Sequence, residues 1–296
     1  MSTKKTGALA VLFASVMWAI EPVFAKLSYQ NSTFLHTSAI RAVLVTVTAF
    51  AYALTTNRTG FRINRRQFST LVYIALAGTL FADLLYLYAL TQVPVINAVL
   101  IGHLQPIFII LIGFSVLRED HLTRFDYIGI GFMMLAALLV TSKTSKNLAS
   151  FRLGSLGDLL VFSATVGWAT TGIAARKYLA CMNAGVVAFY RFLFASIVFA
   201  VYLGSTSAIY IANIYEILVG IVVGGGYILY YEGLKRIKAA QVGALELSTP
   251  FFAALLGFFV IGESISMMQV AGISLLPVGI YYLSKREETA ETSRPF

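Results

Sequence analysis

Charge, cysteine and histidine are all scarce in this 296-residue sequence. Only 12% of the residues are charged, whereas 58% are hydrophobic. Soluble domains carry about twice that share of charge, so we predict an integral membrane protein. The one cysteine, Cys181, excludes an internal disulfide. The three histidines, His36, His103 and His121, lack the spacing of a metal site, and we predict no metal and no other cofactor.

A nucleotide-binding loop is also missing. The chain has no glycine-rich phosphate-binding motif and no soluble segment long enough to hold one, which excludes ATP as the direct energy source. The formal net charge of +9 would suggest a nucleic-acid partner in a soluble protein. Here the basic residues lie in short loops between apolar runs, so their distribution instead indicates membrane orientation and no nucleic-acid partner.

Ten apolar runs of about 20 residues, each long enough to cross a bilayer as a helix, occupy most of the chain. They are residues 7–26, 34–54, 68–90, 94–117, 125–141, 155–175, 184–203, 213–234, 239–261 and 265–283. Connections such as Val93-Pro94 leave room only for a turn between antiparallel neighbours. We predict an all-α membrane fold of ten helices embedded in the lipid bilayer.

The two halves of the sequence match each other at nearly constant offsets. The pairs are Trp18 with Trp168, Arg41 with Arg191, Tyr86 with Tyr230, Pro106 with Pro250 and Glu119 with Glu263. Each half holds five predicted helices, an odd number, so the second half must enter the membrane with the opposite polarity. Inverted repeats of this kind are typical of secondary transporters, whose substrate site lies near the midplane between the repeats.

The repeat and the loop charges together predict the organisation of the chain. We expect a first repeat in residues 1–142, a linker in 143–153, a second repeat in 154–284 and a tail in 285–296. If the N-terminus is cytoplasmic, most lysines and arginines fall on the cytoplasmic side, although the 143–152 loop puts three of them outside. We therefore predict a plasma-membrane protein with both termini and the tail in the cytoplasm.

Several of these residues resemble the pattern of a known family. They are the helix-1 segment 15–18 (Ser-Val-Met-Trp) followed by Lys26, Arg41 in an apolar helix, and Pro106 or Pro250 followed by an apolar run to an acidic residue. The pattern is similar to the EamA family of the drug/metabolite transporter superfamily, in two copies over almost the whole chain. The resemblance implies a carrier whose helices 1–4 and 6–9 surround a central cavity, with helices 5 and 10 peripheral. Members export amino acids and other small metabolites or take up related compounds.

Five charged residues lie well inside the apolar runs, where each charge costs a few kcal/mol. At about 1.5 Å of rise per residue, Glu21, Arg41 and Asp83 come out roughly 7–12 Å below the outer surface. Glu246 and Arg191 come out roughly 10 Å above the inner surface on the same rise. We expect charges at matching depth to pair.

Symmetry between the halves separates two kinds of charged residue. Arg41 and Arg191 occupy equivalent places, which indicates a structural role in an ion pair or a helix cap. The acids Glu21, Asp83 and Glu246 have no acidic counterpart, and we expect them to bind an amino or other cationic group, or a coupling proton. The alternative is that each acid only neutralises an arginine. Two further acids near helix ends, Asp158 and Glu216, are expected to be solvated by water or headgroups.

Uncharged residues complete the candidate site. His103 is either a cavity-lining donor or proton relay, or a histidine bonded to a neighbouring helix. Aromatic side chains predicted to form a cavity wall or core are Trp18, Trp168, Tyr86 and Tyr230. Residues predicted to kink or loosen helices, or to allow close packing, are Pro106, Pro250, Gly224, Gly225 and Gly226.

These observations predict a secondary transporter that moves a small-molecule substrate by alternating access, as a monomer or homodimer and not as an enzyme. Export of an amino acid or a related metabolite is the leading assignment. Uptake of a small organic solute is the first alternative. An intramembrane enzyme is the second, and it would require His103 to act with Glu246 or Asp83.

Overall fold

A computed structural model describes residues 3–56, 60–89, 91–93, 98, 101–102, 104–117, 122–142, 144–149, 155–206, 210–256, 258–259 and 264–284. These residues form helices joined by short connections, and no strand occurs among them. The helices of the first part are α1 (Thr3–Ser28), α2 (Phe34–Thr56), α3 (Arg65–Ile74), a π-helix (Ala75–Asp83), α4 (Leu84–Ala89), α6 (Gln105–Val116) and α7 (Arg124–Ser142). Those of the second part are α8 (Ser145–Ala149), α9 (Leu156–Leu179), α10 (Ala184–Thr206), α11 (Ile214–Leu234), α12 (Ala239–Glu246), α13 (Thr249–Leu256) and α14 (Met267–Ser284).

Eight helical stretches of the described residues are long and apolar enough to cross a membrane. They are Thr3–Ala25, Phe34–Thr56, Arg65–Ala89, Arg124–Ser142, Leu156–Leu179, Ala184–Ser205, Ile214–Leu234 and Ala239–Leu256. A shorter apolar helix, Met267–Leu283, follows. The expected fourth span, residues 94–117, lies partly outside the described residues, so ten spans in two inverted repeats stay a prediction.

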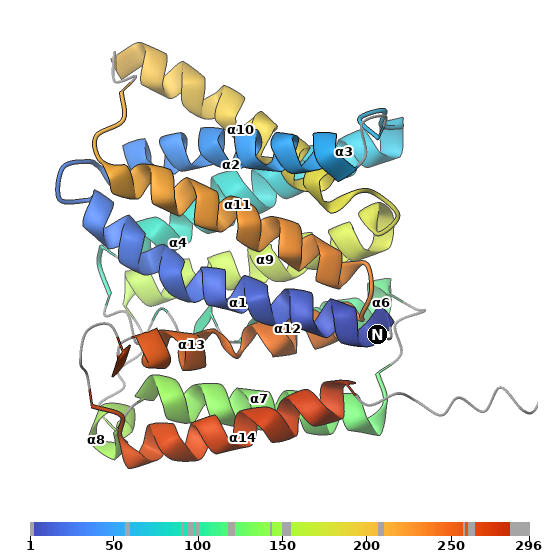
Figure 1. Ribbon diagram of the computed structural model, residues 1–296, viewed down its shortest axis with the longest axis vertical. Coiled ribbons are helices and arrows are strands. Elements are labelled where there is room, and N and C mark those ends of the chain that lie inside the picture. Colours follow the sequence, from blue (N-terminus) through green and yellow to red (C-terminus); the bar gives the residue numbers. More distant parts are fainter. Residues whose placement is uncertain are drawn as a thin grey trace, which may run out of the picture.

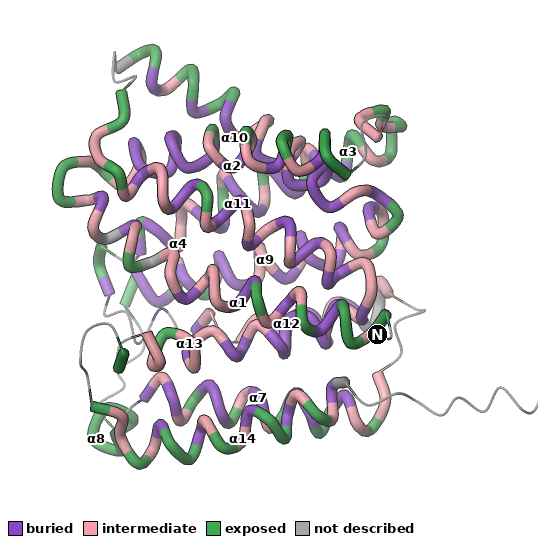
Figure 2. The backbone as a smooth tube through the Cα atoms, in the orientation of Figure 1, coloured by how far each residue is buried: buried purple, intermediate pink, exposed green. Residues whose placement is uncertain are grey.

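The long helices lie side by side, and successive ones run in opposite directions, as Figure 1 shows. Helix α1 packs along α11, α2 along α10, and α7 along α14. The α7–α14 pair lies at one edge of the bundle (Figure 1). Many large apolar side chains remain exposed, among them Val201 at 72% and Met267 at 87%. Figure 2 shows exposed residues along the outer helices of the bundle. A soluble protein does not expose so much apolar surface, but lipid covers it in a membrane.

Two irregular helix segments lie next to residues of the candidate site. The segment Ala75–Asp83 is π-helical, and it ends at a charged residue. A second helix is interrupted between Glu246 and Thr249, where α12 ends and α13 begins. Pro250, in the first turn of α13, has no N–H to donate to the Glu246 carbonyl, which instead accepts a hydrogen bond from Thr249 Oγ1 at 2.7 Å. Isolated π-turns and helix breaks are frequent at functional sites.

Candidate functional site

An ion cluster lies inside the bundle where α1, α2 and the π-helix meet. Arg41 on α2 donates a hydrogen bond from one guanidinium nitrogen to Glu21 on α1. Its other terminal nitrogen donates to Asp83 Oδ2 at 3.0 Å. Arg41 is 5% exposed and Asp83 is 5% exposed. The structure thus brings together three charges that come from three consecutive apolar runs. Mutual neutralisation is the physical reason that such charges can remain in an apolar interior.

Asp83 connects this cluster to residues of the second half of the chain. Its Oδ1 accepts a hydrogen bond from the Trp168 indole N–H at 2.7 Å, and its Oδ2 accepts one from the Tyr227 hydroxyl at 3.4 Å. Arg191 Nη2 lies 3.8 Å from the same Oδ2. One carboxylate therefore contacts groups on α2, α9, α10 and α11.

Arg191 is held mainly by hydroxyl groups. Its guanidinium donates to Thr79 Oγ1 at 2.9 Å, to the Tyr227 hydroxyl at 3.0 Å and to the Tyr231 hydroxyl at 3.1 Å. It also lies 4.3 Å from the centroid of the Tyr227 ring, a cation–π contact. Glycine at position 78 makes room for it, because a Cβ there would lie 2.5 Å from Arg191 Nη2.

Glu246, at the C-terminal end of α12, has a different environment from the other two candidate acids. Its Oε1 accepts a hydrogen bond from the Trp18 indole N–H at 3.2 Å. Its Oε2 is buried and accepts no hydrogen bond from the described residues, and none of them forms an ion pair with it. The expected pairing with Arg191 at matching depth is therefore wrong, because Arg191 turns toward Thr79, the tyrosines and Asp83.

Aromatic rings cover the remaining sides of this region. Trp18 meets the Tyr227 ring edge-on at 4.9 Å between centroids, and Tyr86 lies 5.1 Å from Trp168. Tyr230 is 7% exposed and packs against Tyr227 and Tyr231. All four aromatic residues singled out in the sequence thus contact another aromatic ring near the charged residues.

The three glycines of α11 differ from one another in their surroundings. A Cβ at Gly226 would lie 2.9 Å from Trp18 Cζ3, and one at Gly224 would lie 2.9 Å from Thr48 Cβ. Nothing lies within 4 Å of the corresponding position at Gly225. Gly224 and Gly226 therefore allow α11 to approach α2 and α1 closely, whereas Gly225 does not serve this purpose.

The other candidates lie elsewhere or outside the described residues. His103 is outside them, as are Glu119 and Glu263. Pro106 lies in the first turn of α6, as Pro250 does in α13, and contributes to the surroundings of Gly243. Among the described residues no group of three His, Cys, Asp or Glu side chains could hold a metal ion.

Sequence reasoning missed two buried polar clusters at the ends of the bundle. Glu216 is 0% exposed and accepts a hydrogen bond from Ser32 at 2.7 Å, and its Oε1 lies 2.9 Å from His36 Nδ1. At the end that carries the N-terminus, Asp126 pairs with Lys238 at 3.0 Å and accepts a hydrogen bond from Gln241.

The structure also corrects the prediction that two acids near helix ends are solvated. Glu216 is fully buried, and Asp158 is only 5% exposed. Asp158 takes part in a capping box with Ser155, whose hydroxyl donates to it at 2.8 Å. Protein groups contact both carboxylates, and the tertiary contact to Glu216 leaves no local signal in the sequence.

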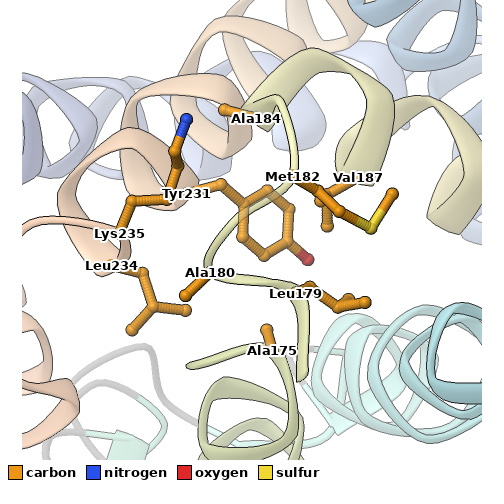
Figure 3. A pocket seen from close by; sticks show the side chains of 9 residues that line it. All are labelled: Ala175, Leu179, Ala180, Met182, Ala184, Val187, Tyr231, Leu234 and Lys235. Carbon is orange, nitrogen blue, oxygen red and sulfur yellow. The ribbon is translucent and has the colours of Figure 1, made fainter. Parts of the chain in front are cut away.

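A small, mainly apolar cavity lies near the end that carries the N-terminus, between α9, α10 and α11. Its wall includes Leu179, Met182, Val187 and Tyr231, as Figure 3 shows. Tyr231 connects this cavity to the charged region, because its hydroxyl accepts a hydrogen bond from Arg191.

Comparisons with known proteins agree with this arrangement. The model of the EamA-like transporter family matches residues 5–142 and 155–285. An uncharacterized transporter of Methanothermobacter thermautotrophicus is 28% identical over 229 residues, which are 75% of this chain and 66% of that protein, slightly less than two thirds of its length. The uncharacterized transporter YyaM of Bacillus subtilis is 22% identical over 224 residues, 73% of each chain. A solved crystal structure at 18% identity shares the fold, with a TM-score of 0.76 over 94% of this chain and 96% of that one.

Proposed function

Because the chain belongs to the EamA-like transporter family, we propose that it is a secondary carrier that moves a small organic solute by alternating access. Export of an amino acid or a related metabolite with an amino group is our leading assignment. Uptake of such a solute is the alternative, since the family match indicates transport and not its direction. The proposed ligand of the solute's amino group is Glu246.

The observation that carries this proposal is the environment of Glu246, whose carboxylate lies inside the bundle and forms no ion pair with the described residues. Glu21 pairs with Arg41, and Asp83 lies beside both Arg41 and Arg191, so two arginines balance these two acids. Among the described residues, the Trp18 indole is the one hydrogen-bond donor to Glu246, and its Oε2 accepts no hydrogen bond. A buried carboxylate needs a hydrogen-bond donor or a positive charge beside it. An amino group of the solute supplies both, and a coupling proton is the second candidate.

The backbone around Glu246 supports a binding role. The residue ends α12, and α13 begins only three residues later. Interrupted helices are a recurring way to place substrate groups at the midplane of secondary transporters. The Trp18 indole, which meets the Tyr227 ring, lies next to this point and offers an apolar surface to the rest of the solute.

The test is a metabolite panel in proteoliposomes loaded at two pH values, with both uptake and export followed for the wild type and for Glu246→Gln. Glutamine keeps the size of the side chain and removes its charge. We expect transport to fall by about tenfold to a hundredfold, as the loss of a charge-assisted hydrogen bond implies. Cationic and amino-bearing solutes should be affected more than neutral ones.

Glu232→Gln is the matched control. Glu232 lies on α11, but it forms ion pairs with Arg236 and Lys235, and all three side chains are partly exposed. It should keep wild-type transport. Asp83→Asn provides a second comparison within the charged cluster. Full activity of Glu246→Gln and Asp83→Asn, with an unchanged pH dependence, would rule out the proposed roles of both acids. Chemical conversion of the solute during flux would support the enzyme alternative instead.

A further inference from the structure

A basic groove lies between α3 and α9 at the end of the bundle that carries the N-terminus, well away from Glu246. Its volume is about 690 Å³, and its lining includes Arg65, Arg66, Ser69, Thr70 and Tyr178. No acidic residue occurs among the described residues that line it. The groove therefore offers positive charge and hydroxyl donors together, which is the chemistry that recognises a phosphate group.

The arginine at the mouth of the groove is held in place. Arg66 lies with its guanidinium carbon 4.4 Å from the centroid of the Tyr178 ring, so the two planes form a cation–π contact between the helices. Lys177 Nζ lies 5.5 Å from the same ring and adds a third positive charge at this place. A fixed guanidinium binds phosphate more strongly than a freely moving one, because less side-chain entropy is lost.

The exposed side chains become less polar from the start of α3 toward the π-helix that follows it. Arg65, Ser69 and Tyr73 follow one another at helical spacing and are all exposed, and Leu76, one turn further, is 53% exposed. Tyr73 donates its hydroxyl to Thr170 on α9 at 2.9 Å, which closes the polar part of the groove. The stripe thus begins with charge and ends with apolar surface. A phospholipid, with its headgroup above its acyl chains, has the same order.

We propose that this groove binds an anionic phospholipid, with the phosphate on Arg65 and Arg66 and an acyl chain along Tyr73 and Leu76. Basic pockets between membrane helices are a known type of lipid headgroup site. A soluble phosphate would use only the basic groove and would leave the exposed apolar surface at Leu76, beyond the groove, uncovered. The inference depends on the membrane position of α3 and α9, and it does not depend on the transported solute.

The test is native mass spectrometry of the full-length protein with phosphatidylglycerol or phosphatidylcholine added at equal concentration. We expect phosphatidylglycerol adducts to dominate in the wild type. Arg65→Gln/Arg66→Gln should weaken phosphatidylglycerol binding by about tenfold or more, since each basic residue near an anionic lipid contributes about fivefold. The matched control is Arg62→Gln/Arg124→Gln, which removes two exposed arginines from the same end of the bundle but outside the groove.

Several outcomes would overturn the proposal. Equal losses in the two double variants would indicate general attraction to a positive surface, and equal binding of both lipids would exclude headgroup recognition. Binding of glycerol phosphate as tight as that of the lipid would indicate a soluble anion site. If the double variant does not fold, Arg66→Lys decides, because it keeps the charge and loses the planar fork. A clear loss of adducts in that variant supports the site, and an unchanged level rejects it.

Discussion

Trp168 donates its indole N–H to Asp83 at 2.7 Å, and Trp18 makes the equivalent contact with Glu246 at 3.2 Å. Each tryptophan belongs to one half of the chain and each carboxylate to the other. The indole has no charge, so it fixes the direction of a carboxylate without neutralising it. In this exchange across the two halves, one acid lies beside Arg41, whereas the other forms no ion pair with the described residues.

Replacing Arg41 by glutamine should strongly destabilise the protein, because it leaves Glu21 and Asp83 buried without their main counter-ion. The free energy of unfolding should fall by about 3–5 kcal/mol, as for other broken buried pairs. Denaturant unfolding in micelles measures this change. Adding Glu21→Gln should restore part of the loss, and Arg62→Gln, at an exposed loop position, should change stability by less than about 0.5 kcal/mol. Equal effects of Arg41→Gln and Arg62→Gln would contradict the role of the cluster.

Neighbouring glycines of α11 allow a test of close packing. In Gly226→Ala the new methyl group would lie 2.9 Å from Trp18, so the indole must move away from its place beside Glu246. We expect a loss of about 1–3 kcal/mol in unfolding free energy. Gly225→Ala meets open space and should be neutral or stabilising by up to about 1 kcal/mol. Unfolding of both variants checks the contrast, and a Gly225→Ala protein as unstable as Gly226→Ala would argue against it.

The role of the helix interruption at Pro250 can be tested by comparing variants of two prolines. Pro250→Ala supplies the missing N–H for the Glu246 carbonyl and should favour a continuous helix from α12 into α13. If this break is the hinge that we predict, solute flux should slow while amide exchange of residues 247–249 also slows. Pro277→Ala changes a proline inside α14, where the helix is continuous. Slower flux in both variants, or in neither, would count against a hinge at Pro250.

The single cysteine tests the predicted orientation of the chain. Cys181 is exposed in the turn between α9 and α10, at the same end of the bundle as the N-terminus. With a cytoplasmic N-terminus, a membrane-impermeant maleimide should label it only after the membrane is opened. Asn31→Cys in a Cys181→Ser background lies in the exposed turn at the opposite end and should be labelled in intact cells. The reverse pattern of labelling would place both termini outside.

The helices and the resemblance to the EamA family could be read from the sequence, and the family match confirms that resemblance. Apolar runs must become helices in a membrane, because only internal hydrogen bonds satisfy their backbone. The depths of Glu21, Arg41 and Asp83 also follow from simple rise per residue, and the structure places the three side chains together. Depth is a one-dimensional property that the order of residues determines directly.

The direction in which a side chain points from its helix is harder to obtain. The π-helix that ends at Asp83 contains at least one extra residue, which turns every later side chain by about 100° relative to an ideal helix. Nothing in the segment 75–83 signals this change. The same limit explains why the role of Tyr227 was missed: it looks like an ordinary apolar residue until α11 packs beside Arg191.

The positions of Glu21, Arg41 and Asp83 in the chain also bear on how the protein is made. All three precede residue 84, so the ribosome completes this set of charges before any of the second half exists. Arg41 can then pair with an acid as the first three segments enter the bilayer, which avoids about 2.5–3.5 kcal/mol for each ion of that pair. The second arginine beside Asp83, Arg191, arrives only with the second half. Glu246 is synthesised near the end and meets Trp18, which has been in the membrane since the beginning. The order of synthesis thus delivers the arginine-paired acids of the first half early and Glu246 late.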